Sequence, residues 1–146
     1  MEDNNSQENP EDFFKQLIVN LSKAIEINPE DVGSYFERGM AKTFLDDFQG
    51  SIEDFSKVIE INPQDWESFR NRGISKSSIG KYKSSIEDFN KAIEINPEDE
   101  VSYCNRGSVK WRSKDNIGAI EDWEKGARLG CEMSAGLLEK YRNQNS

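Results

Sequence analysis

The side chains in this sequence that could do chemistry are mainly carboxylates, because 28 of the 146 residues are Asp or Glu and none is His. Paired carboxylates can act as acid and base in hydrolysis. Here the acids recur at regular positions such as Asp54, Asp88 and Asp122, without a Gly-rich phosphate loop or a nucleophile motif. We therefore interpret them as residues of helix faces. The sequence predicts no catalytic residues and no enzyme, which stays a remote alternative.

The other potentially reactive groups are the two thiols of Cys104 and Cys131. A nucleophilic thiol needs a base to activate it, and the chain contains no histidine for that role. The two residues are not spaced as a C-x-x-C pair, and zinc sites usually combine Cys with His ligands. We therefore expect no metal site and no cofactor. Two reduced thiols are favoured over the alternative, a disulfide, for a helical chain without an export signal.

The charge balance argues against two classes of partner. The formal net charge is −9 and the pI about 4.6, and no cluster of Lys and Arg is visible. Nucleic acids and anionic membrane surfaces both select basic patches, so we expect neither as a partner. The chain has no apolar run of about 18 residues that would span a membrane. Its polar, acidic start at Met1–Asn9 does not resemble a signal peptide, so we expect a cytoplasmic protein.

A period of 34 residues dominates the sequence. The string KAIEINPED occupies residues 23–31 and 91–99, an offset of twice the period, and the similar KVIEINPQD lies halfway between them at 57–65. Three single-residue columns follow the same period. They are Arg38, Arg72 and Arg106; Gly39, Gly73 and Gly107; and Pro29, Pro63 and Pro97. Several independent columns with one period indicate a repeat protein, in which similar units stack.

Two helices per unit must position these residues. An Asp two residues after each Pro suits the N-cap of a first helix, which ends near Phe44, Ser78 or Arg112. After a short break, a second helix carries SIEDFSKVIEI, SIEDFNKAIEI or AIEDWEKGARL. Asn-Pro ends the first two of these, because proline cannot continue a helix. The glycine column lies inside the first helix, where glycine is costly, so we expect it to admit the paired helix closely.

The spacing resembles the tetratricopeptide repeat, whose pattern is aromatic-x-x-L-G-x-x-Y, then A-x-x-x-F, then P. The matching strings are Tyr35-x-x-Arg38-Gly39-x-x-Lys42 with Ser51-x-x-x-Phe55, Phe69-x-x-Arg72-Gly73-x-x-Lys76 with Ser85-x-x-x-Phe89, and Tyr103-x-x-Arg106-Gly107-x-x-Lys110 with Ala119-x-x-x-Trp123. This resemblance implies an all-α protein, a right-handed α-α superhelix (solenoid) of three repeats with a capping helix at each end. The expected ranges are a disordered acidic tail at 1–10, a capping helix at 11–28, repeats at 32–65, 66–99 and 100–133, and a second capping helix at 133–142.

The sequence departs from the family pattern in the same way in all three repeats. Arg stands where the family has Leu, and Lys stands where it has Tyr. On a helical wheel, Arg38 and Lys42 share the face of Gly39 that meets the second helix, where Asp54 flanks Phe55. The sequence therefore predicts a ladder of Arg and Lys to Asp pairs along the solenoid. The alternative is a row of arginines that binds anions.

The opposite side of the first helices lines, by the family resemblance, a concave groove for a peptide or a partner helix. The implied groove residues are Phe36, Glu37, Met40, Thr43, Arg70, Asn71, Ile74, Ser77, Val101, Cys104, Asn105, Ser108 and Trp111. Aromatic and Met residues are frequent anchors at interfaces, and Asn can bond an extended backbone. Two alternatives stay open: Phe36 and Met40 could pack under the N-terminal helix, and Trp111 near the C-terminal one.

The leading hypothesis is a protein–protein interaction module, an adaptor or scaffold that binds a partner segment in this groove. We expect a monomer with a protein or peptide partner, and self-association as a structural or assembly factor is the alternative. One subfamily grips the carboxylate end of chaperone tails with Lys, Arg and Asn. Phe36, Met40, Val101 and Asn105 stand at those positions and only Asn71 matches, so that ligand is disfavoured.

Overall fold

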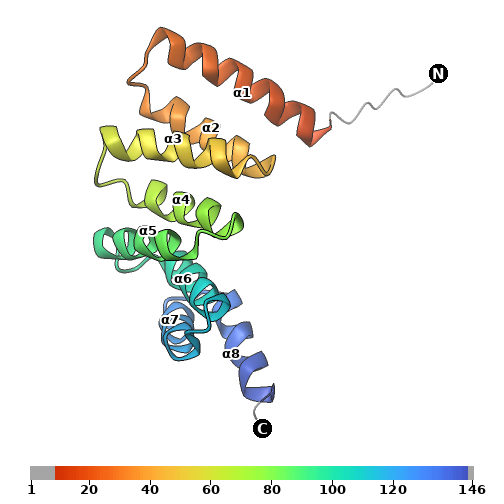
Figure 1. The fold of residues 1–146 in the computed structure, drawn as a ribbon, viewed down its shortest axis with the longest axis vertical. Coiled ribbons are helices and arrows are strands. Elements are labelled where there is room, and N and C mark those ends of the chain that lie inside the picture. The colour runs from red at the N-terminus through yellow and green to blue at the C-terminus, as the bar shows by residue number, and fades with distance from the viewer. Residues whose placement is uncertain (1–8, 145–146) are drawn as a thin grey trace, which may run out of the picture.

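The computed structural model describes residues 9–144, which fold into eight α-helices and contain no strand. The helices are α1 (Pro10–Ile27), α2 (Val32–Phe44), α3 (Phe48–Ile61), α4 (Trp66–Ser78), α5 (Tyr82–Ile95), α6 (Glu100–Arg112), α7 (Asn116–Arg128) and α8 (Glu132–Gln144). Each helix packs chiefly against its neighbours in the chain, so the helices stack in sequence order, as Figure 1 shows. This arrangement confirms the predicted all-α solenoid, with the helix pairs α2–α3, α4–α5 and α6–α7.

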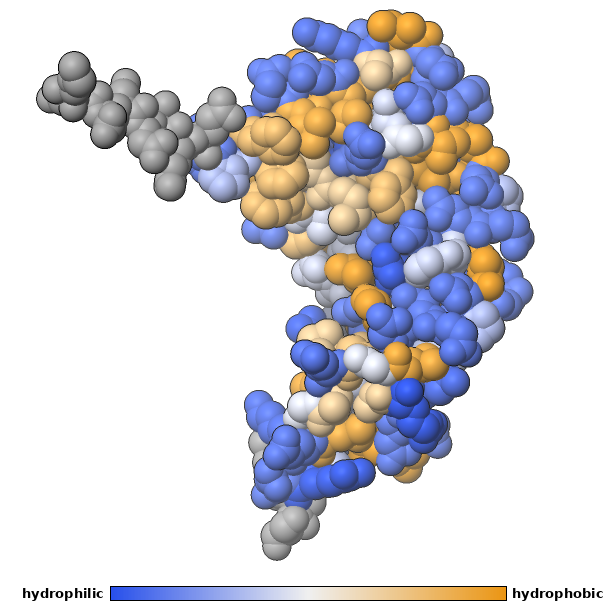
Figure 2. All heavy atoms as spheres, turned by 180° about the vertical axis from the view of Figure 1, so that it is seen from behind, coloured by the Kyte–Doolittle hydropathy of each residue, from blue (hydrophilic) through white to orange (hydrophobic). Residues whose placement is uncertain are grey.

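The stack is curved. The first helices of successive pairs contact each other directly, α2 with α4 and α4 with α6. They therefore lie on the inner side of the curve. Figure 2 shows the molecule from behind as a crescent with one hollowed side, where hydrophobic side chains gather next to the N-terminal end.

Aspartates start the first helix of every pair. Asp31, Asp65 and Asp99 each accept a hydrogen bond from the backbone N–H three residues further on, at 3.4, 3.4 and 3.2 Å. Each carboxylate thereby satisfies a donor that the first helical turn leaves unpaired. The three caps thus fix where these helices begin.

The first helix of each pair is followed by one residue in the left-handed conformation. These residues are Asp46, Gly80 and Lys114, with φ of 58°, 77° and 67°. Glycine adopts this conformation without a steric clash, whereas in Asp46 and Lys114 the Cβ atom makes it unfavourable. The turn in the middle repeat is therefore the least strained of the three.

The glycine of each first helix lies against the aromatic residue of its second helix. Phe55, Phe89 and Trp123 are nearly inaccessible to solvent, at 0%, 0% and 3% exposure. A Cβ placed on Gly39 or Gly73 would stand 3.1 Å from the facing phenyl ring, and on Gly107 it would stand 2.7 Å from the indole. The glycines are therefore required by close packing, and the third contact is the tightest.

The predicted ladder of ion pairs is confirmed in all three repeats. Nε and Nη2 of Arg38 donate to the two carboxylate oxygens of Asp54 at 2.9 and 2.6 Å, and Lys42 Nζ lies 2.9 Å from Oδ2. Asp88 and Asp122 each hold an Arg and a Lys in the same way, at 2.6–2.9 Å. Such bidentate pairs are directional as well as strong.

Each of these arginines also reaches the second helix of the preceding unit. Nη1 of Arg38, Arg72 and Arg106 donates to Ser22, Ser56 and Asn90 at 3.0, 3.0 and 2.7 Å. One guanidinium thus joins three consecutive helices. Because Nε, Nη1 and Nη2 all donate inside the protein, the structural role is favoured over the alternative of a row of arginines that binds anions.

The two terminal helices cover the ends of the stack. Asn20 of α1 stands at the position of the ladder aspartates, is exposed and accepts a hydrogen bond from Gln16; within residues 9–144 no helix precedes α1 to offer it an arginine. Asn9 caps α1, which begins at Pro10, inside the range 1–10 assigned to the tail; proline suits this first position because its missing N–H would be unpaired. The rest of that expected tail, residues 1–8, lies outside the described residues.

The C-terminal helix α8 begins one residue before the expected 133–142 range and continues two residues beyond it. Its Leu138 is buried against Ala119 and Trp123 of α7. Trp111, on α6, packs against the same cluster. The docking of α8 therefore builds a surface that the three repeats alone would not form.

Candidate protein-binding surface

All of the groove residues that the resemblance implied lie on α2, α4 and α6, the helices on the inner side of the curve. Glu37 and Met40 are exposed, and Cys104 is buried. The other ten are half-buried: Phe36, Thr43, Arg70, Asn71, Ile74, Ser77, Val101, Asn105, Ser108 and Trp111. Twelve of the thirteen residues thus present some surface to a partner.

Cys104 corrects this set. Its side chain is 0% exposed, because the start of α8 with Cys131 and Ser134 lies beside it. This burial raises the pKa of Cys104 to about 11. A helical wheel of α6 places Cys104 on the groove side, but it does not show that α8 covers this position, so the assignment to the groove was wrong. Both cysteines are free thiols.

Arg70 is a second residue whose role differs from the expectation of an open groove. Its Nη1 lies 3.0 Å from Oδ1 of Asp99, and its guanidinium lies over the ring of Trp66 at 4.9 Å. The contact ties α4 to the N-terminus of α6. Arg70 therefore supports the inner surface more than it offers a free charge to a ligand.

Several other polar groove residues are engaged within their own helices. The hydroxyls of Thr43, Ser77 and Ser108 and the amide of Asn105 each donate to a backbone carbonyl of the preceding turn, at 2.8–3.0 Å. Asn71 forms no side-chain hydrogen bond within residues 9–144. It therefore keeps both a donor and an acceptor for a partner.

The apolar side chains of α2 differ in how far they are covered. Phe36 packs its ring edge-on against Phe55 of α3, with centroids 5.6 Å apart, whereas Met40 keeps 45% of its surface exposed. Phe44, one helical turn after Met40, is 56% exposed and stacks on Phe14 of α1 at 4.0 Å. The sequence analysis missed Phe44 because it treated this residue only as the end of the helix.

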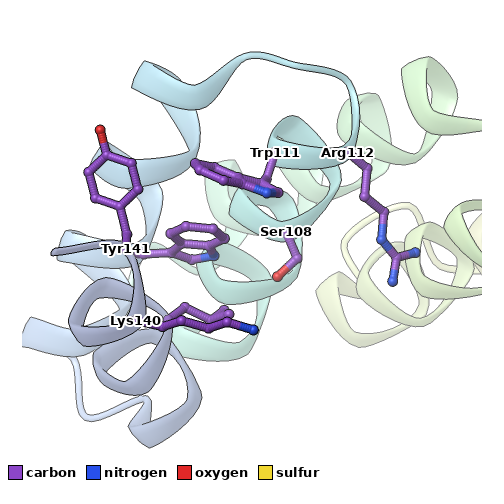
Figure 3. Close-up of a pocket in the computed structure, with 7 residues that line it drawn as sticks. Ser108, Trp111, Arg112, Lys140 and Tyr141 are labelled. Atoms are coloured by element: carbon purple, nitrogen blue, oxygen red, sulfur yellow. The ribbon is translucent and has the colours of Figure 1, made fainter. Parts of the chain in front are cut away.

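A pocket of about 380 Å³ lies where α6, α7 and α8 meet. Figure 3 shows several of its lining side chains, which are Ser108, Trp111, Arg112, Trp123, Leu137, Lys140 and Tyr141. The ring of Trp111 stands edge-to-face to Tyr141 at 5.7 Å and lies 5.5 Å from Trp123. The alternative that Trp111 packs near the C-terminal helix is thus correct, and the same contact forms a wall of the pocket.

Five of the seven pocket residues were not among the predicted groove residues. Trp123 was placed only in the aromatic column of the repeat pattern, and Leu137 and Tyr141 belong to the capping helix. One signal was available in the sequence: Trp123 stands where the first two repeats have Phe. A repeat that departs from the shared pattern next to a capping helix indicates that this end of the stack forms contacts of its own.

The described part of the chain contains no group of three His, Cys, Asp or Glu side chains placed to hold a metal ion. Within the same residues, none of the helices combines the length and the apolar character needed to cross a membrane.

Comparisons with known families match two separate segments of the repeat array. Residues 32–65 match the family model described as tetratricopeptide repeat, and residues 78–114 match a second model described as TPR repeat. Together with the helix pairs of 34-residue period, these matches establish that the chain is a tetratricopeptide-repeat (TPR) protein. No curated protein sequence matches it.

Solved structures share this fold. A crystal structure of MamA superposes with a TM-score of 0.81 at 20% identity, over 89% of this chain and 79% of that one. MamA from Desulfovibrio magneticus RS-1, from residue 41 to its end, gives 0.76 at 17% identity, over 80% of this chain and 66% of that one. The first TPR of Spaghetti (RPAP3), bound to the HSP90 peptide SRMEEVD, gives 0.73 at 19% identity, over 79% and 94%. At such identities the likeness describes the fold alone.

Proposed function

We propose that this TPR protein is an adaptor that binds a segment of a partner protein along the inner side of its curve. The observation that carries the proposal is the exposed apolar surface of α2, where Met40 keeps 45% of its area accessible beside the half-buried Phe36. Met adapts its shape to a partner, and aromatic residues anchor interfaces. Asn71, on the adjacent α4, adds an amide that can bond a backbone.

The ladder supports the same proposal from the opposite side of these helices. Nη1 of each ladder arginine donates to a side chain of the preceding helix, and these contacts hold the first helices at fixed spacing. A rigid inner surface loses little conformational freedom when it binds a flexible segment. The location of this adaptor in the cytoplasm stays a prediction from the sequence.

We propose that the partner segment differs from the HSP90 peptide SRMEEVD that is bound to the first TPR of RPAP3. That ligand ends in the acidic sequence EEVD. In this chain, Phe36 and Met40 offer no positive charge in the first repeat, and the neighbouring Arg70 is bound to Asp99. We therefore propose a ligand for α2 and α4 that relies on apolar contacts rather than on a clamp for a carboxylate.

The experiment is affinity capture from a lysate of the source cells with matched baits. Met40→Glu places a charge on the proposed surface, and Ile117→Glu does the same on α7, where Ile117 is 76% exposed. Both baits must first show the helicity and melting temperature of the wild type. We expect a partner that Ile117→Glu retains and Met40→Glu loses. Equal capture by both baits contradicts binding on the inner surface.

Self-association is a second candidate function, because α1 presents an apolar surface at the end of the stack. Phe13, Val19 and Ile27 of α1 are 54%, 46% and 86% exposed. Light scattering separates the two functions. A stable dimer that Ile27→Glu dissociates favours assembly, whereas a monomer at all concentrations favours the adaptor.

A further inference from the structure

We propose that the pocket between α6, α7 and α8 anchors one aromatic side chain of an acidic peptide segment. This inference rests on the proposed function, since it describes how the C-terminal end of the inner surface would select its ligand. It concerns different residues from Met40 and Phe36, so the two proposals can fail separately.

The size and lining of the pocket fit one large apolar side chain. Its volume of about 380 Å³ is at the lower end of the range for small-ligand sites, which begins at about 300 Å³. Trp111, Trp123, Leu137 and Tyr141 supply an apolar floor and walls. Trp111 and Tyr141 already meet edge-to-face, with an interplanar angle of 82°. A further ring could join this cluster in the offset or edge-on arrangements that aromatic groups prefer.

The charges around the pocket favour a peptide with acidic residues on either side of its aromatic residue. Arg112 and Lys140 line it from α6 and α8, are exposed, and form no ion pair within residues 9–144. Figure 3 shows Ser108 between these two side chains in that view. No Asp or Glu is among the lining residues. In a chain with a net charge of −9, the opening thus carries a local positive charge, which complements carboxylates of a ligand.

The contrast with the other cations of the first helices strengthens this point. Arg38, Arg72 and Arg106 of the ladder all bind a buried aspartate at 2.6–2.9 Å. Arg112 is six residues after Arg106 on the same helix, beyond the reach of the ladder. Its charge is therefore available to a ligand.

A buried donor lies in the wall of the same pocket. Nε1 of Trp123 is inaccessible to solvent and has no hydrogen-bond partner within the described residues. The indole lies against Gly107, next to the pocket residue Ser108. Buried N–H groups without an acceptor are rare and costly. Because solvent does not reach this atom, the indole N–H belongs to the contact between α6 and α7, and the pocket recognises its ligand through the apolar lining and the two cations.

The test uses the ¹⁵N-labelled full chain and the indole N–H signals of its three tryptophans, Trp66, Trp111 and Trp123. The probe is the peptide acetyl-Asp-Glu-Phe-Asp-Glu-amide. Two control peptides replace Phe by Ala, or the four acids by Lys. We expect the probe to shift the signals of Trp111 and Trp123 and to leave Trp66 unchanged, because Trp66 lies on α4 outside the pocket. Neither control peptide should cause these shifts.

Variants then test the role of charge. Arg112→Gln with Lys140→Gln should weaken binding of the probe about tenfold or more, because both charges meet the ligand. Lys23→Gln with Lys83→Gln removes the same net charge from two exposed lysines elsewhere and should leave affinity unchanged within about twofold. Both double variants alter exposed side chains, so each should keep the wild-type melting temperature.

Three results would overturn the proposal. They are no indole shift with the probe at millimolar concentration, equal shifts with the Lys control, and unchanged affinity in the Arg112 and Lys140 variant. Shifts produced equally by AMP would assign the pocket to nucleotides instead and would also overturn it. If the peptide does not bind the pocket while Met40→Glu still loses a captured partner, this inference is wrong and the proposed adaptor function is retained.

Discussion

The interior of the solenoid and its C-terminal pocket are built from the same helices by different rules. In the interior, Gly, Arg, Lys and Asp recur every 34 residues and make the same contacts three times. The pocket belongs to the third repeat, where Trp123 replaces the Phe of the other repeats and α8 docks beside it. The residues that follow the period stabilise the fold, whereas the irregular residues form the surface on which, in our proposal, specificity depends.

The largest effect should come from breaking the ladder in its middle. Asp88→Leu leaves Arg72 and Lys76 partly buried and without their shared carboxylate, which we expect to destabilise the protein by about 3–5 kcal/mol. Urea denaturation measures this loss. Glu87→Leu alters the adjacent, exposed acid and should change stability by no more than about 0.5 kcal/mol. Equal losses in both variants would mean that the ladder does not hold the fold.

The two thiols should differ strongly in reactivity, because one lies inside the stack. Burial raises the pKa of Cys104 to about 11, so about one in a thousand molecules carries its thiolate at pH 8. The pKa of Cys131 is lowered overall. Burial raises it, but hydrogen bonds lower it by more, among them those from the backbone amides of Met133 and Ser134. We expect iodoacetamide to modify Cys131 about a hundredfold faster, as measured by peptide mass spectrometry. Similar rates would show that α8 does not cover α6.

Replacing the close-packed glycine should destabilise the protein more in the third repeat than in the second. Gly107→Ala places a methyl group 2.7 Å from the indole of Trp123, and we expect a loss of about 1–3 kcal/mol through overpacking. Gly73→Ala meets Phe89 at the longer distance of 3.1 Å, and since both variants regain about 1 kcal/mol of helix propensity, its net loss should be smaller. Thermal unfolding compares the two variants. A larger loss for Gly73→Ala would reverse the comparison of the repeats.

The smallest effect concerns the helix cap of the first repeat and depends on pH. The pKa of Asp31 is lowered because the hydroxyl and the backbone amide of Ser34 donate to its carboxylate. Its stabilisation is therefore full above the pKa of the unfolded chain and is lost as the pH falls through the lower, folded pKa. We expect Asp31→Ala to lower the melting temperature at about pH 6 and to match the wild type at about pH 2. A difference that persists at low pH would contradict this role of the carboxylate.

Sequence reasoning predicted the parts of the molecule that repeat. The 34-residue period predicts the helix pairs, and the helical wheel predicts the pairing of Arg38 with Asp54 that the structure confirms. It misplaced Cys104 and missed most of the pocket, because both depend on how α8 docks against α6 and α7. That docking involves residues outside the repeat, such as Leu137 and Tyr141, for which no second copy exists to reveal the register.

One measurement tests most directly the claim that the partner binds on the inner side of the curve. It is amide hydrogen exchange of the full chain, free and in complex with the captured partner, analysed helix by helix. We expect slower exchange in the complex for α2, α4 and α6, and little change in α3, α5 and α7. Protection confined to α3, α5 and α7, or to α1, would contradict it and move the interface to the outer side or to the end of the stack.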